Sequence, residues 1–384
     1  MAAVDVAVIG GGIAGVSVAA FLAEGGLRVR LYERDAIAAG ASGRNSGIVQ
    51  HPFDPIMADL YGRSLAEYRK LADATGGAFA LGDEPAGLLL VGREIAAAKV
   101  AARDWAGAWP VTRPDVVVGA DLRALEPALA PDLVACRLTI GFPVTPGAAT
   151  EAFAAVARRA GVDVVVGGGV ARPVVVDGHV TGVERNGSVE PAGEVVVAAG
   201  PWTPDVVEPA GTWRPIRSSW GVVASVVLPN APRHGLEAID ITVEPHADAA
   251  PESASRQVHD DEVEFSLVPA TGSSALGSTF LPNEPDPEMW VASLRSVGSR
   301  YVPAVAAAPL VGLRRCARPV SRDGRPLVGR APWVDGLWIL AGHGPWGIST
   351  APGSARLVAD AILGRGPDDA IPAALAAARF GWPR

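Results

Sequence analysis

Three glycines and one carboxylate near the start of the chain have the types and the spacing that bind a dinucleotide. Gly10, Gly12 and Gly15 form the pattern G-x-G-x-x-G, and Glu33 follows the next apolar run. In a strand–helix–strand unit the first glycine makes the tight turn, the second lets the backbone approach a pyrophosphate and the third allows close helix packing. The acid binds ribose hydroxyls. The pattern predicts a dinucleotide cofactor, but nicotinamide and flavin enzymes share it.

The elements that must position these residues can be read from the same stretch. Val4–Ile9 is a β-branched apolar run, typical of a parallel strand buried on both faces. A helix is expected over Ala14–Glu24, ended by Gly25 and Gly26, because glycine takes the left-handed capping conformation without strain. The second strand is expected over Leu27–Tyr32. The chain thus starts with one βαβ unit.

Composition indicates a well-buried globular enzyme. Of 384 residues, 49% are hydrophobic and 19% are charged, and the net charge of -8 argues against a nucleic-acid surface. The sequence has no apolar run of about 18 residues that could span a bilayer. Because the first strand starts at Val4, we expect no signal peptide and a cytoplasmic protein. Two cysteines, Cys136 and Cys316, predict neither a disulfide framework nor a metal site.

The segment after the second strand favours a flavin over a nicotinamide. It reads ERDAIAAGASGRNSGIVQH, and a run so rich in small residues can lie against a large ligand with its backbone N–H groups facing it. We expect Ser42–Gly47 to be a polar loop that meets phosphate and the isoalloxazine ring. A flexible solvent loop is the alternative, and the first motif alone leaves a nicotinamide-dependent dehydrogenase open.

Two later blocks complete a resemblance to a known family. The middle block predicts a helix over Gly147–Ala160, a buried strand over Val162–Val166, a hairpin turning at Asp177-Gly178 and a strand over Glu194–Ala198. The last block predicts the strand Leu337–Leu340, a glycine-rich turn and a helix over Ile348–Leu363. With these blocks in order, the chain resembles the glycine oxidase, sarcosine oxidase and D-amino-acid oxidase or dehydrogenase family of FAD enzymes.

The resemblance implies an α/β, Rossmann-like FAD-binding domain and a discontinuous α+β substrate domain built on an antiparallel sheet. The FAD-binding domain would comprise residues 1–47, 143–212 and 318–384, and the substrate domain residues 48–142 and 213–317. Strands are expected in WGVVASVVL, EVEFSLVPA and SALGSTFL, and a helix over Asp286–Arg300. Pro245–Gln257 has the composition of a mobile loop.

The motifs and the resemblance together assign the cofactor contacts. Val170 would contact the adenine through its backbone, and the start of the last helix would stabilise negative charge on the reduced flavin. The assigned residues are Gly10, Gly12, Ile13, Ala14, Gly15, Glu33, Arg34, Ser42, Gly43, Arg44, Asn45, Ser46, Gly47, Val170, Ala199, Gly200, Cys316, Gly342, His343, Gly344, Pro345, Trp346, Gly347 and Ile348.

Arg318 is the expected substrate-binding residue. The resemblance gives the arginine of an Arg-Pro pair before an Asp-Gly turn the task of gripping a carboxylate, and a guanidinium can do so through two parallel hydrogen bonds. A structural ion pair is the alternative. The chain has Ser266 and Pro345 where glycine oxidase-like chains carry a tyrosine and an arginine, which favours a bulkier or more apolar substrate than glycine, walled by Trp220 or Trp346.

The reaction implied is flavin-dependent oxidation of a C–N bond in an amino acid or secondary amine, giving an imine that water hydrolyses. His51 could accept a proton or tune the flavin, or be structural. The chain has no lysine after Lys99, whereas sarcosine oxidase-like oxidases use one to activate oxygen, so another electron acceptor is favoured. An electron-relay subunit of a larger complex is a further alternative.

Cys316 has the register of the cysteine that holds the flavin covalently in sarcosine oxidase-like relatives. Glycine oxidase-like relatives have no cysteine there, and small buried cysteines are common. Neighbouring arginines at 314, 315 and 318 would favour a thiolate if they point toward it. Covalent and non-covalent FAD are both open.

Overall fold

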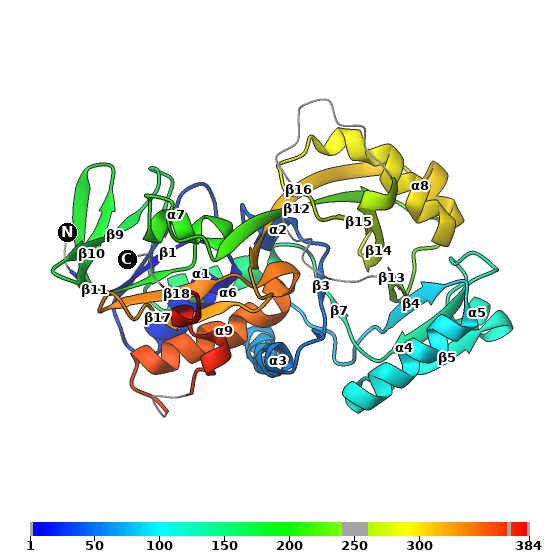
Figure 1. Ribbon diagram of the computed structural model, residues 1–384, viewed down its shortest axis with the longest axis horizontal. Coiled ribbons are helices and arrows are strands. Elements are labelled where there is room, and N and C mark those ends of the chain that lie inside the picture. The colour runs from blue at the N-terminus through cyan, green and yellow to red at the C-terminus, as the bar shows by residue number, and fades with distance from the viewer. Residues whose placement is uncertain (1–2, 240–259, 367–369, 382–384) are drawn as a thin grey trace.

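The computed structural model describes residues 3–239, 260–366 and 370–381. Two eight-stranded sheets organise these residues, and Figure 1 shows them in two lobes joined by long strands. The expected mobile loop, Pro245–Gln257, lies outside the described residues. Within the described residues, no helix has both the length and the hydropathy needed to cross a membrane.

The first sheet is the expected Rossmann-like sheet, with β1 at its centre. β1 pairs in parallel with β2 on one side and with β11 on the other. Val6 and Val8 face one core, and Ala7 and Ile9 face another, so the strand is buried on both faces as its composition predicts. In spatial order the main strands are β17 (Leu327–Arg330), β18 (Leu337–Ala341), β11 (Ser188–Val197), β1 (Val4–Ile9), β2 (Val29–Glu33) and β8 (Asp163–Val166).

Four helices pack together on one face of this sheet. Phe21 of α1 meets Phe153 of α6 edge to face, with 5.7 Å between ring centroids. α1 ends where expected, and Gly26 takes the left-handed conformation with φ +93°. The helices are α1 (Ile13–Glu24), α3 (Pro55–Thr75), α6 (Ala148–Arg159) and α9 (Gly347–Ile362).

The other face carries the predicted hairpin and a short helix. β9 (Arg172–Val176) and β10 (His179–Arg185) are joined through Asp177 and Gly178, whose φ values of +51° and +78° suit a two-residue hairpin turn. β10 then pairs with β11, and α7 (Thr203–Val207) follows that strand.

The second sheet combines two segments that are distant in the sequence. β13 pairs in parallel with β4, and the other pairings of this sheet are antiparallel. Helix α8 (Val291–Tyr301) packs on β14 and β15. Helix α4 (Ile95–Ala108) packs on β4, β5 and β6, and α5 (Gly119–Leu125) packs on β5 and β6 from the opposite face. In spatial order the strands are β16 (Leu310–Ser321), β12 (Ile216–Val226), β15 (Ser273–Thr279), β14 (Val263–Ala270), β13 (Gly235–Ala238), β4 (Leu88–Gly92), β6 (Val134–Leu138) and β5 (Asp115–Val118).

A few expectations differ from the structure. The expected polar loop at 42–47 begins with a one-turn helix, α2 (Ala41–Arg44), because the Asn45 side chain donates to the carbonyls of Ala41 and Ser42. β8 lies at the sheet edge and is half-exposed, so it is not the buried strand expected. The helix expected from Asp286 begins as a 3-10 turn over Pro287–Trp290. β11 starts six residues earlier than expected, at Ser188.

The domain boundaries stay a prediction, which the separate sheets support. A two-stranded pairing of β3 (Ile48–Val49) with β7 (Phe142–Pro143) lies where the chain passes between the lobes. β16 continues through the expected boundary after residue 317, so one strand belongs to both sides of it.

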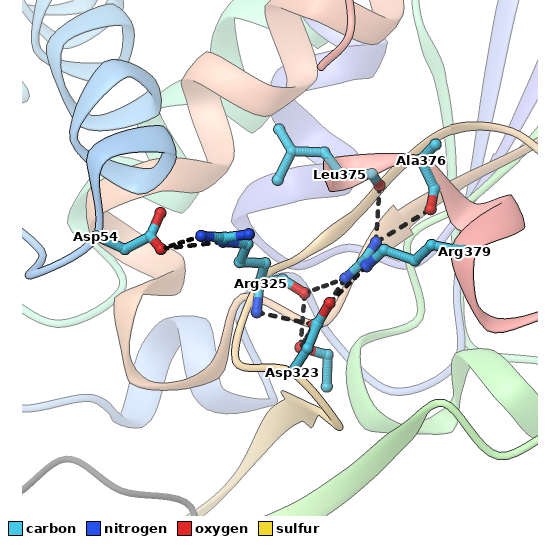
Figure 2. A network of polar contacts seen from close by, with 7 residues as sticks. Asp54, Asp323, Arg325, Leu375, Ala376 and Arg379 are labelled. Carbon is cyan, nitrogen blue, oxygen red and sulfur yellow. Dashed lines mark hydrogen bonds and ion pairs between the residues drawn. The ribbon is translucent and has the colours of Figure 1, made fainter. Parts of the chain in front are cut away.

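A polar network connects the start of α3 with the turn at Asp323 and Arg325, which follows β16, and with Arg379 near the C-terminus (Figure 2). Asp54 caps α3 by accepting from the backbone N–H groups of its first turn, and it also accepts two hydrogen bonds from Arg325 at 2.7 and 2.9 Å. Asp323 accepts from Arg379 at 2.7 and 2.9 Å. The carbonyl of Arg325 also accepts from Arg379.

Candidate functional site

A cavity of about 750 Å³ extends from the carboxyl end of β1 to one face of the second sheet. It brings together most of the expected cofactor residues, which come from all three motif blocks. Those that line it are Gly10, Gly12, Ile13, Ala14, Glu33, Arg34, Ser42, Arg44, Asn45, Ser46, Gly47, Val170, Ala199, Gly200, Cys316, His343, Gly344, Pro345, Trp346, Gly347 and Ile348, together with Arg318. The expected residues outside the lining are Gly15, Gly43, Gly342 and His51.

The glycines at the cavity edge are required by close backbone approaches. Gly10 has φ +117°, and a Cβ there would overlap the carbonyl oxygen of Ala198 on the neighbouring strand. A Cβ at Gly15 would overlap the carbonyl oxygen of Gly10, which is the helix-packing role expected of the third glycine. Gly43 packs in the same way against the carbonyl oxygen of Ala38. Gly15 and Gly43 therefore shape the cavity without lining it.

The turn before α1 is held by two side chains. Glu33 accepts from the backbone N–H of Gly11 at 2.6 Å through one carboxylate oxygen. Ser42 Oγ accepts from the backbone N–H of Ile13 at 2.9 Å. The first turn of α1 contains no acidic residue, so its N-terminus presents positive potential to the cavity.

A stacked pair of side chains lines the cavity beside the end of β2. The guanidinium of Arg34 lies over the Trp202 ring, 5.0 Å from its centroid, and pairs with Asp35 at 2.9 Å. Ala199 and Gly200 follow β11 directly and line the cavity beside this pair.

Helix α9 brings its N-terminus to the cavity through the turn Gly344–Trp346. Burial lowers the pKa of His343 to about 3, so its imidazole is neutral. Ser354 donates its hydroxyl to the Thr350 carbonyl, so His343 Nε2, 3.1 Å from Ser354 Oγ, is the donor in that pair. His343 is thus a buried hydrogen-bonding residue of the turn that also lines the cavity.

Strand β16 places Arg314, Cys316 and Arg318 on one face, because side chains of a strand alternate. Arg318 is buried, and its guanidinium donates to the Thr279 carbonyl at 2.7 Å and to Ser278 Oγ. These contacts use two of its five N–H groups. The guanidinium carbon also lies 4.3 Å from the centroid of the Phe280 ring.

The arginines near Cys316 have partners of their own. Arg314 donates to the Asn45 carbonyl at 3.1 Å and to Ser225 Oγ at 2.6 Å, and so ties β16 to the segment after α2. Arg315 pairs with Glu284 at 2.6 Å. Cys316 itself is buried and lines the cavity.

His51 lies in an aromatic cluster outside the cavity lining. Its ring centroid is 5.3 Å from that of Tyr61 and 4.8 Å from that of Trp109. Burial lowers the pKa of His51, which favours the neutral ring. Phe53 bridges this cluster to Trp346 of the lining, with ring centroids 5.3 Å apart. A proton would therefore have to reach His51 indirectly.

The second sheet forms the far wall, and it contains residues that sequence reasoning missed. Trp220 and Ser266, which the sequence analysis named, line the cavity. Glu237 and Glu264 of this sheet line it too, as does Gln50, which follows β3, and the sequence predicted none of these three. The segment EVEFSL alternates polar and apolar residues, and GLEAI carries a single acid among apolar residues. This alternation predicts half-buried strands, but it equally fits acids that face solvent.

No cluster of three or more His, Cys, Asp or Glu side chains in the described part of the chain could hold a metal ion. Lys70 pairs with Glu67 on α3, Lys99 is exposed on α4, and neither lines the cavity.

Comparison with known proteins decides the family. The model of the FAD-dependent oxidoreductase family named DAO matches residues 5–361. The chain belongs to this family. The expectation of FAD as the cofactor is thereby confirmed, and the nicotinamide alternative is set aside.

Relatives of the chain include a D-amino acid dehydrogenase and a glycine oxidase. The chain is 32% identical over 219 residues to a D-amino acid dehydrogenase of Cereibacter sphaeroides, a match that covers 57% of this chain and 46% of that protein. It is 40% identical over 75 residues to a glycine oxidase of Pseudomonas aeruginosa, covering 20% of this chain and 21% of that protein. The chain thus spans about half the length, or less, of these relatives.

Solved structures confirm the fold over nearly the whole chain. The glycine oxidase of Geobacillus kaustophilus matches with a TM-score of 0.80 at 22% identity, covering 99% of both chains. The L-proline dehydrogenase of P. horikoshii matches with a TM-score of 0.77 at 18% identity, covering 95% of this chain and 94% of that one.

Proposed function

We propose that this protein oxidises the C–N bond of an amino acid or secondary amine that carries a carboxylate, with FAD as its cofactor and hydrolysis of the resulting imine by water. The observation that carries the proposal is the position of Arg318, a buried guanidinium in the wall of the cavity that the FAD motifs open into. The names of the relatives, D-amino acid dehydrogenase and glycine oxidase, support the same substrate class.

The residues present fit FAD. Gly10 and Gly15 allow the close backbone approaches that form the turn before α1, and the N-terminus of α1 offers backbone N–H groups to a pyrophosphate. The Glu33 carboxylate holds the turn and has lone pairs left for ribose hydroxyls. Arg34 and Trp202 would flank the adenine.

The start of α9 would support the flavin ring. Gly347 and Ile348 line the cavity, and no acidic residue lies in the first turn of this helix. Its positive potential would stabilise negative charge on a reduced ring. When bound, FAD supplies the two-electron acceptor for a hydride equivalent from the substrate's α-carbon.

Arg318 would hold and orient the substrate. Its contacts with Ser278 and Thr279 fix the plane of the guanidinium while leaving N–H groups for a carboxylate. Fixing the carboxylate fixes the α-carbon, which supplies the orientation that C–H transfer needs.

The walls would admit a side chain larger than that of glycine. Ser266 and Pro345 line the cavity where glycine oxidase-like chains carry a tyrosine and an arginine. Trp220 and Trp346 also line it, which supports their proposed role as substrate walls. A cytoplasmic location and an electron acceptor other than oxygen stay predictions, and a partner subunit stays an open alternative.

A screen of flavin bleaching tests the proposal. Purified protein is expected to be yellow and, without oxygen, to lose its flavin colour with a member of a panel of D-amino, N-methyl and cyclic amino acids. Arg318→Met is expected to raise KM for that substrate about a hundredfold, because a charge-assisted bidentate grip is lost. Arg315→Met, which removes the pair with Glu284 on the same strand, is the matched control. Colourless protein, or an Arg318→Met variant with unchanged KM, contradicts the proposal.

Oxygen consumption with the same substrate decides the electron acceptor. Because no lysine lines the cavity, we expect slow peroxide formation and fast turnover with an artificial acceptor dye. Fast peroxide formation would show an oxidase.

A further inference from the structure

Two carboxylates share the cavity wall with Arg318. Glu237 on β13 pairs in register with Ser266 on β14, and Glu264 lies two residues before that serine. Leu236 and Ala238 face the core that packs beneath α8, so Glu237 faces the opposite side of the sheet. Glu237 and Glu264 both line the cavity.

Alternation on β14 confirms the direction of Glu264. Phe265 stacks on Tyr301 of α8, with ring centroids 4.1 Å apart, and belongs to the core on that side. Its neighbours Glu264 and Ser266 therefore point the other way, into the cavity. The two acids come from adjacent strands and lie on one surface.

Glu237 differs from other acids of the lining in its partners. Among the described residues it accepts a hydrogen bond from the Gln50 amide at 3.4 Å and has no ion-pair partner within 4 Å. A half-buried carboxylate without a cation is costly, and a second carboxylate beside it adds repulsion. Three other lining acids have arginine partners: Glu284 with Arg315, Asp205 with Arg214 and Asp35 with Arg34.

Glu237 and the Arg318 guanidinium lie two strands apart on one wall, and Glu264 lies on the strand between them. The Arg318 guanidinium donates to Ser278 on β15, and Glu237 lies on β13, two strands away. Two strand spacings are about 10 Å. This separation suits a substrate with a carboxylate at one end and a cation at the end of a long side chain.

We propose that the substrates are amino acids whose side chain carries a second positive charge, with Arg318 binding the carboxylate and Glu237 and Glu264 binding the side-chain cation. The inference rests on the proposed function, since it takes the role of Arg318 from it. Among the described residues Glu237 has no cationic partner, and the cation of the substrate side chain would be that partner. The sheet fixes the distance between Arg318, which would bind the carboxylate, and Glu237.

Matched substrate pairs test the proposal in the holoprotein. Flavin bleaching without oxygen is measured with lysine against norleucine and with arginine against citrulline, each in both D and L forms. The charged member is expected to be favoured in kcat/KM by about tenfold to a hundredfold, the range for a hydrogen bond to a charged group. Equal rates for charged and uncharged members overturn the inference.

Variants show whether the two acids cause the preference. Glu237→Gln and Glu264→Gln keep the size of the side chain, and each is expected to lower the lysine-to-norleucine ratio about tenfold. Glu288→Gln, on an exposed residue outside the cavity lining, is the matched control and keeps the wild-type ratio. If the acids bind the α-amine instead, the variants lower kcat/KM for lysine and norleucine equally. The lysine-to-norleucine ratio then stays unchanged, which overturns the inference.

Binding without turnover gives a second measurement. ε-Aminocaproate has the carboxylate and the terminal ammonium of lysine but no α-amine to oxidise, and caproate lacks the ammonium. We expect ε-aminocaproate to raise the Tm of the wild-type holoprotein more than caproate, and Glu237→Gln to abolish the difference. Equal shifts in wild-type protein overturn the inference.

These outcomes separate the two proposals. If no amino acid of either class bleaches the flavin, the proposed function fails. If norleucine or citrulline bleaches it as fast as the charged partner, the proposed function stands and the side-chain inference fails.

Discussion

The guanidinium of Arg318 occupies the space that a side chain at Gly221 would need. A Cβ built on Gly221 would overlap the guanidinium carbon and both terminal nitrogens. Gly221 lies on β12, opposite Cys316 of β16, and Arg318 leans across it to reach Ser278 and Thr279. This glycine therefore determines where the guanidinium of Arg318, the proposed carboxylate-binding group, lies, although a glycine has no side-chain chemistry of its own.

Gly221→Ala is expected to raise KM for the amino acid substrate about tenfold to a hundredfold, because the guanidinium must leave its hydrogen-bonded position. Steady-state kinetics measure the change, and flavin content reports on the fold. Gly312→Ala is the matched control, since a Cβ at Gly312 on the neighbouring strand meets its nearest atom at 3.5 Å. Unchanged KM in Gly221→Ala would mean that the carboxylate is bound elsewhere.

Asp54 combines a helix cap and an ion pair, and substitutions can separate them. Asp54→Ala is expected to lower the free energy of unfolding by about 1–2 kcal/mol, because α3 loses its cap and Arg325 loses its partner. Asp54→Ser keeps a capping oxygen, so its free energy of unfolding is expected to fall by about half as much as that of Asp54→Ala. Urea unfolding measures both.

The control for the two Asp54 variants is Asp59→Ala in the same helix. Asp59 pairs with Arg63 on the surface, where such pairs contribute little, so a change within about 0.5 kcal/mol is expected. If Asp54→Ser is as unstable as Asp54→Ala, the cap contributes nothing and the Arg325 pair carries the effect.

Local patterns predicted the βαβ unit well, because its strands and helix depend on neighbouring residues. The sequence pattern for β1 matches the structure over Val4–Ile9, and the hairpin at Asp177-Gly178 forms where its turn residues indicate. The same patterns could not distinguish an edge strand from a central one, so β8 was wrongly expected to be buried.

The sequence predicted those residues of the candidate site that belong to a continuous sequence motif. Gln50, Glu237 and Glu264 belong to segments far apart in the chain, and the pairing of β13 with β4 and β14 brings two of those segments together. Such pairings depend on tertiary packing. His51 illustrates the reverse, since its position after the flavin loop suggested chemistry while packing placed it among aromatic rings.

Glu237 makes the stability of the fold depend on pH. Burial raises the pKa of Glu237 to about 7, opposed by the hydrogen bond from Gln50 and increased by the charge of Glu264. The native state therefore binds this proton more tightly than the unfolded chain, and stability falls as pH rises from the unfolded pKa through the folded one. Among the described residues no cation pairs with Glu237 to reverse this trend.

Glu237→Gln is expected to stabilise the protein at about pH 8 by on the order of 2 kcal/mol relative to wild type, and by little at about pH 5. Thermal unfolding at both pH values measures the difference. Glu288→Gln on the surface is expected to change stability equally at both. A pH-independent effect of Glu237→Gln would show that this carboxyl titrates normally.

The position of Cys316 makes covalent attachment of FAD testable. Its side chain shares one face of β16 with Arg314 and Arg318 and lines the cavity. Cys136 is also buried, but it belongs to a different core, outside the cavity lining, where burial raises the pKa of its thiol to about 11. The two cysteines are thus a matched pair for a test.

If Cys316 holds FAD through a thioether, the yellow colour stays with acid-precipitated wild-type protein and with Cys136→Ser. The colour then leaves the pellet of Cys316→Ser, because that bond alone resists unfolding. Absorbance of pellet and supernatant measures the split. Release of all FAD into the supernatant from wild-type protein rules out the bond, and Cys316 is then a small packing residue between β12 and the cavity.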